Sequence, residues 1–162
     1  MSDEVEAEEA VTEEAGAYVK PLDRQVETFR VVHVESVLFD LGDPSPMVHL
    51  MEAESPYRNV SIPLALADAT ALHAALFNRE GRRPGTHELF ATVLARLQSD
   101  VIAAKIVRHE GGVFYAELDL MTPRGREVVD CRTSDALILA LRQAVAAPIL
   151  CLESILQPFN GV

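Results

Sequence analysis

Two segments decide the fold: Gly111-Gly-Val-Phe-Tyr-Ala-Glu-Leu-Asp-Leu120 and, after a short connection, Cys131-Arg-Thr-Ser-Asp-Ala-Leu-Ile-Leu-Ala-Leu-Arg142. The first alternates apolar and other side chains, which predicts a strand over 113–121 with one core face and one face that is exposed or lines a cleft. The second is apolar on nearly every side, which predicts a helix over 135–146 inside the domain. The chain therefore contains a strand that leads into a buried helix.

Further strands are predicted on both sides of these segments, because runs rich in Val, Ile and Phe alternate with turn-forming residues. They span residues 28–39, 47–52, 58–62, 101–109, 126–131 and 148–152. Other segments predict a mostly buried helix over 64–78 and a second helix over 86–98. The last two strands, with the helix between them, have the length of a βαβ-like crossover. We expect one compact α+β domain with a mixed, largely antiparallel sheet and about three main helices.

Acidic residues are concentrated at the N-terminus. Residues 1–16 contain seven acids and no base, which leaves a net charge of −4 for the rest of a chain whose total is −11. Such a segment buries too little apolar surface to offset the entropy of ordering it, so we expect a disordered tail over 1–25 and the folded domain over 26–162. An acidic body also disfavours tight non-specific binding of nucleic acid, which usually needs a basic surface.

Targeting signals and cysteine pairs are not evident in the sequence. No segment has the pattern of a secretory signal, and none has the roughly 18 consecutive apolar residues of a membrane span. We therefore expect a cytoplasmic protein without a membrane partner. Cys131 and Cys151 are isolated from each other and from histidines at ligand spacing, so both are predicted to be reduced, buried thiols.

Two helix starts share their residue types: Arg-Pro-Gly-Thr-His-Glu at 83–88 and Arg-Thr-Ser-Asp at 132–135. Helix N-termini attract anions, and arginine adds a planar donor fork that suits phosphate. If the starts converge, His87 would be a general acid or base beside a phosphate site, with Asp135 close by. The phosphate-binding residues would then be Arg83, Thr86, Arg132 and Ser134. The alternative is that the hydroxyls, from Thr86 and from Ser134 or Thr133, only cap their helices and the acids only balance the dipoles.

A second candidate site contains carboxylates. Glu117 and Asp119 lie on one strand face, about 7 Å apart. Together with Glu88 or Asp135 they would supply oxygen ligands for Mg²⁺ or Mn²⁺, the ions that metal-dependent nucleases use. The alternative is that they form the solvated face of an antiparallel strand, paired with Arg124 or Arg126.

The order of these motifs resembles the bifunctional nuclease domain family over roughly residues 29–156. The matching segments are Asp68-Ala-Thr-Ala, Arg83-Pro-Gly-Thr-His-Glu-Leu, Gly112-Val-Phe-Tyr-Ala-Glu-Leu and Arg132-Thr-Ser-Asp-Ala. The resemblance implies an α+β domain that self-associates, most simply as a dimer, and a plant branch of the family is credited with cutting DNA and RNA. Residue by residue, it selects Thr86, His87, Glu117, Arg132, Ser134 and Asp135. The chain departs from the family's Ile-Trp-Ile-Gly, with Ile62-Pro-Leu-Ala65 in its place.

Two functions follow as hypotheses. The first is a nuclease that hydrolyses phosphodiesters of DNA or RNA with a divalent metal, in which His87, Glu117 and Asp135 are catalytic. The second is a non-catalytic oligomeric domain that binds a small anionic ligand or a protein partner, which the acidic body favours. Convergence of the named residues in one cleft would support the first, and their scatter over separate faces would support the second.

Overall fold

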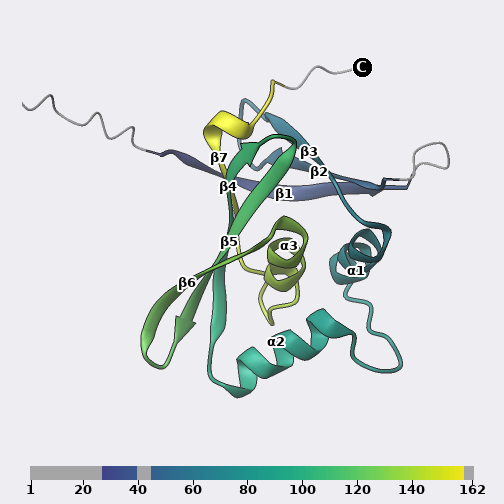
Figure 1. The fold of residues 1–162 in the computed structure, drawn as a ribbon, viewed down its shortest axis with the longest axis vertical. Helices are drawn as coiled ribbons and strands as arrows, with labels where there is room; N and C mark the ends of the chain where they lie inside the picture. The colour runs from purple at the N-terminus through teal and green to yellow at the C-terminus, as the bar shows by residue number, and fades with distance from the viewer. Residues whose placement is uncertain (1–26, 40–44, 159–162) are drawn as a thin grey trace, which may run out of the picture.

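Residues 27–39 and 45–158 are described by a computed structural model, in which seven strands form one bent sheet (Figure 1). The strands are β1 (Phe29–Leu38), β2 (Met47–Glu52), β3 (Asn59–Pro63), β4 (Asp100–Glu110), β5 (Val113–Thr122), β6 (Gly125–Arg132) and β7 (Ile149–Leu152). The helices are α1 (Leu66–Leu76), α2 (Thr86–Arg96) and α3 (Thr133–Leu141), and a 3-10 turn, η1 (Glu153–Ile155), follows β7. Each strand end lies within one residue of its predicted position. The tail predicted over 1–25 lies outside the described residues.

The strand order along the sheet is β3-β2-β1-β7-β4-β5-β6. Neighbouring strands are antiparallel except β4 and β7, which are parallel. This mixed sheet with its three helices confirms the predicted α+β class. The predicted crossover is only partly right, because α3 connects β6 to β7 but these strands are separated in the sheet by β5 and β4.

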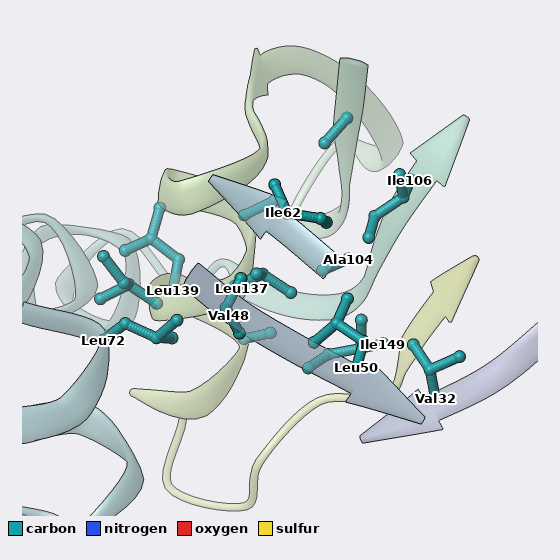
Figure 2. Packing of buried hydrophobic residues seen from close by; sticks show 14 of the residues in the cluster. Val32, Val48, Leu50, Ile62, Leu72, Ala104, Ile106, Leu137, Leu139 and Ile149 are labelled. Carbon is teal, nitrogen blue, oxygen red and sulfur yellow. The ribbon is translucent and has the colours of Figure 1, made fainter. Parts of the chain in front are cut away.

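The helices lie in the angle of the bent sheet. In Figure 1, β1 to β3 run across the top and β4 to β6 down the left side, while α3 lies between these two parts with α1 and α2 beside it. Seven of the nine residues of α3 are buried, which confirms the prediction of an internal helix. Figure 2 shows side chains of the sheet, α1 and α3 meeting in this core, where Leu50, Leu72 and Leu137 are fully buried. Burying side chains of this size contributes about 1.5–3 kcal/mol each, so α3 is held firmly in place.

The predicted helices differ from the observed ones mainly in exposure and length. The helix predicted over 64–78 is not mostly buried, because only Ala69, Leu72 and Ala75 of α1 are buried. The helix predicted over 135–146 ends at Leu141, since the segment after it turns toward β7. Composition alone did not reveal the exposure of the first helix or the early end of the third, because Ala and Leu favour a helix whether it is buried or exposed.

The face of β5 opposite the helices is not fully solvated. Asp119 is only 3% exposed. Lys105 Nζ lies 3.0 Å from its Oδ2 atom, and Arg126 binds both of its carboxylate oxygens. The prediction that Arg126 pairs with this face is therefore confirmed. The prediction that the face is solvated is wrong for Asp119, which is buried. Among the described residues, no helix combines the length and apolar character needed to span a bilayer.

Candidate functional site

The starts of α2 and α3 meet in space. His87, in the first turn of α2, has its Nε2 atom 2.9 Å from Oδ1 of Asp135, in the first turn of α3. These residues are 48 positions apart in sequence and their side chains are 18% and 27% exposed. The convergence expected for a shared site is therefore present, and a hydrogen bond fixes it.

Arg132 lies beside this pair and binds two carboxylates. Its Nε and Nη2 atoms donate to the two oxygens of Asp135, each at 2.8 Å. Its Nη1 and Nη2 atoms donate to Asp68 of α1 at 3.1 and 3.4 Å. Because Asp68 comes from a third element, the guanidinium ties the starts of α1 and α3 together.

The predicted helix caps are wrong. The residues that precede the helices are Gly85 and Arg132, both in extended conformation, and neither helix has a side-chain cap. Ser134 instead donates from Oγ to Oδ2 of Asp68 at 3.1 Å, and Thr133 donates to the carbonyl of Phe114 at 3.1 Å. Both hydroxyls lie inside the first turn of α3, where they face neighbouring elements rather than their own helix.

The third acid of the site is Glu88. Its Oε2 atom accepts a hydrogen bond from the Gly85 amide at 2.7 Å, which places an acid at the positive end of α2 as predicted. Its Oε1 atom lies 3.0 Å from Nη2 of Arg142, whose side chain is only 8% exposed. Arg142 also donates to the carbonyl of Arg79 at 2.8 Å. This arginine therefore holds the loop before α2 against the end of α3.

These groups line a cavity of about 530 Å³ between the three helices. Its lining includes three acids and three arginines: Asp68, Glu88, Asp135, Arg83, Arg132 and Arg142. His87 and Thr86 also line it, and alanines of α1 supply an apolar wall. Arg83 differs from the other two arginines, because the described part of the chain shows no acid paired with it. It is therefore the cation most readily available to an incoming anion.

The ion pairs determine the charge states in the site. Partial burial alone would raise the pKa of the Asp135 carboxyl, but hydrogen bonds from Arg132 and His87 outweigh it and lower that pKa below its ordinary value. The hydrogen bond to Asp135 and its negative charge, followed by Asp68, raise the pKa of Arg132 above its ordinary value. Asp135 is therefore ionised at neutral pH, and its hydrogen bond favours the His87 tautomer with the proton on Nε2, in which Nδ1 is the acceptor.

Glu117 does not line this cavity. It pairs across the sheet with Lys105 and Asp130, and strand alternation directs it away from the core residues Ala116 and Leu118. The structure therefore does not unite Glu117 with Asp135 as the predicted Mg²⁺ or Mn²⁺ ligands. In the described part of the chain, no cluster of three or more His, Cys, Asp or Glu side chains is arranged to hold a metal ion.

The sequence matches the bifunctional nuclease domain over residues 48–160. The chain belongs to this family. Two relatives that are 31% identical over 125 residues are the uncharacterized proteins MT1877 and Rv1829 of two Mycobacterium tuberculosis strains. The match covers 77% of this chain and 73% of each relative.

Every residue of the cavity named above lies within the part of the chain that matches the bifunctional nuclease domain. Of the predicted site residues, Arg83, Thr86, His87, Arg132 and Asp135 line the cavity. Ser134 does not, since it is buried behind it against Asp68. The sequence assigned no role in binding or positioning to Asp68 and Arg142, although Asp68 begins one of the family motifs.

Proposed function

We propose that this cavity binds and cleaves a phosphodiester. The single observation that carries the proposal is the hydrogen bond from His87 to Asp135, which joins two arginine-bearing helix starts at one cavity. A histidine oriented by an ionised carboxylate is a recurrent arrangement for general acid–base catalysis. Membership of the bifunctional nuclease domain family supports a phosphodiester as the substrate.

The cavity residues divide into three roles under this proposal. His87 transfers protons through Nδ1, while Asp135 fixes its tautomer and stabilises the imidazolium that forms. Arg83 binds the phosphate directly, and Arg132 contributes its charge and its remaining N–H. The N–H groups at the start of α2 add a favourable dipole for the anion.

The test is cleavage of end-labelled single- and double-stranded DNA and RNA by wild-type protein and by His87→Ala. The matched control is His33→Ala, because His33 is an exposed histidine on β1 outside the cavity. We expect cleavage by wild type and by the control and a loss of about 100-fold or more in His87→Ala, the contribution typical of a general acid or base. Equal cleavage by all three proteins would show that the nuclease is a contaminant and would refute the proposal.

A second candidate is a non-catalytic domain that acts as a homodimer and binds an anionic ligand or a partner. An exposed apolar stripe on α2 favours it: Leu89, Phe90, Val93 and Leu97 are 42–63% exposed. Leu89 and Leu97 lie four residues before and four residues after Val93. If α2 of a second copy packed antiparallel against this helix, Leu89 of each copy would contact Leu97 of the other, and the contact would be self-complementary. Light scattering on wild type and Val93→Glu tests this, since only the wild type should have the mass of a dimer. A wild type that remains monomeric would refute it.

A further inference from the structure

An aromatic cluster is exposed where β1 and α1 end. Phe39 directly follows β1 and Phe77 directly follows α1, and they are 46% and 60% exposed. The ring of His73 lies between them in the contact order, with its centroid 4.8 Å from that of Phe77 and 6.1 Å from that of Phe39. Contiguous apolar surface left in water often marks a binding site, and here that surface consists of ring faces and edges.

A guanidinium group is held beside this cluster. The central carbon of the Arg79 guanidinium lies 5.6 Å from the centroid of the Phe77 ring, within the range of a cation–π contact. The backbone of Arg79 is fixed at two points. Its amide donates to the carbonyl of Ala74 at 2.8 Å, and its carbonyl accepts from Arg142 at 2.8 Å. The positive charge therefore stays close to the exposed ring.

The aromatic cluster borders the cavity described above. Thr70 and Ala74 of α1 line that cavity, and they precede His73 and Phe77 by three positions each. Residues three apart on a helix are neighbours, with Cβ atoms about 5–6 Å apart. A ligand that extends beyond the cavity along the end of α1 would therefore meet the ring of Phe77.

The segment that leads from the cluster to the cavity is basic, although the chain as a whole is acidic. Residues 79–83 contain three arginines and one acid, Glu80. The first arginine, Arg79, lies at Phe77, and the last, Arg83, lines the cavity. Aromatic side chains next to arginines are the combination that binds single-stranded nucleic acid, because bases stack on the rings and phosphates pair with the cations.

We propose that Phe77, with His73 and Phe39, forms a platform on which an unpaired base of the nucleic acid stacks while a neighbouring phosphate lies in the cavity. This inference rests on the proposed function and adds a base-binding subsite to it. Arg79 and Arg83 bind the phosphates on the two sides of that base. Because every base has a ring face, the platform accepts DNA and RNA alike.

The experiment measures binding by fluorescence anisotropy with three labelled strands of equal length: oligothymidylate, oligouridylate and an abasic strand, which keeps the phosphates but has no bases. Each strand is measured with the full chain before cleavage is detectable on a gel. The variants are Phe77→Leu, which keeps an apolar side chain without a ring, and Phe77→Tyr, which keeps the ring. The control is Tyr57→Leu, because Tyr57 is a similarly exposed aromatic in the turn between β2 and β3, at the opposite end of these strands from Phe39.

We expect wild type to bind both base-bearing strands more tightly than the abasic strand. Phe77→Leu should weaken binding of both by about 5- to 150-fold, the range for stacking of one base on an aromatic side chain, and should leave the abasic strand unaffected. Phe77→Tyr and the control should bind as wild type does. Equal affinity of wild type for all three strands, or an unchanged affinity in Phe77→Leu, would overturn the inference. So would a Phe77→Tyr variant as weak as Phe77→Leu.

Two further measurements on the same proteins separate this inference from its alternatives. If Phe77→Leu converts a dimer into a monomer in light scattering without changing strand binding, the cluster contacts a second copy and the inference is overturned. Cleavage that is lost in His87→Ala, with no effect of Phe77→Leu on binding, would overturn the platform and leave the proposed function intact. Equal cleavage by wild type and His87→Ala, with base-dependent binding lost in Phe77→Leu, would refute the proposed function and support the platform as a binding site.

Discussion

Asp68 offers the sharpest test of the contacts that hold the site together. Its side chain accepts from Ser134 at 3.1 Å and from Arg132 at 3.1 and 3.4 Å. The two contacts differ in burial, since Ser134 is 6% exposed whereas the Arg132 side chain is 65% exposed. Replacing Asp68 therefore removes one buried and one largely solvated interaction.

The two contacts should have different energetic weights. An ion pair with an arginine this exposed contributes about 0–1 kcal/mol. A buried hydroxyl left without its acceptor costs about 1–3 kcal/mol. Asp68→Ala loses both, so we expect it to lower the free energy of unfolding by about 1–4 kcal/mol. Asp68→Asn keeps an oxygen for Ser134 and should cost about 1 kcal/mol or less.

The assay is urea unfolding at pH 7 and one protein concentration, followed by circular dichroism because the chain has no tryptophan. The decisive variant is Asp68→Ala/Ser134→Ala, which removes donor and acceptor together. It should be more stable than Asp68→Ala alone, because no unpaired hydroxyl remains buried. If the double variant is less stable than Asp68→Ala, or Asp68→Asn is as unstable as Asp68→Ala, the reasoning is refuted.

Three further predictions concern the fold. The hydrogen bond from Arg126 outweighs burial and, with Lys105, lowers the pKa of Asp119 below its ordinary value. Its stabilising effect should therefore be complete above about pH 4 and be lost as pH falls through the lowered pKa, so unfolding free energies of wild type and Asp119→Asn should converge in acid. Burial raises the pKa of Cys151 to about 12 and that of Cys131 to about 11, so neither thiol should be labelled rapidly at pH 8 unless urea is added; fast labelling of the native protein would contradict this. Leu137→Ala should cost about 2–5 kcal/mol in urea unfolding because the side chain is fully buried, and a cost below 1 kcal/mol would show that α3 is not the centre of the core.

The sequence predicted the strands well because alternation and turn residues are local signals. Val113 to Thr122 is the clearest case, since its core side chains and the following turn are all visible in one short segment. The position of β7 was not predictable in the same way. Its pairing with β1 and β4 depends on which edges remain free after the rest of the sheet forms, and no local pattern carries that information.

The candidate site was predictable where its residues share a helix start. Thr86 and His87 were found because they follow an arginine in a recognisable helix signal, as does Asp135. Asp68 was missed as a positioning residue because its partner Arg132 is 64 positions away. Glu117 was included wrongly with the cavity residues, since the sequence shows that it faces away from the core but not which face the helices cover.

The position of β7 in the sheet also bears on how the protein is made. Among the described strands, β7 alone pairs with both β1 and β4, which do not pair with each other. During synthesis, β1 to β3 and β4 to β6 can each form as a separate antiparallel unit, but strand pairing cannot join them into one sheet before β7 exists. Until then both units expose an unpaired edge that could pair with another nascent chain. The joining of the sheet therefore depends on the strand that is made last, and before it forms the edges of β1 and β4 are most open to pairing with another chain.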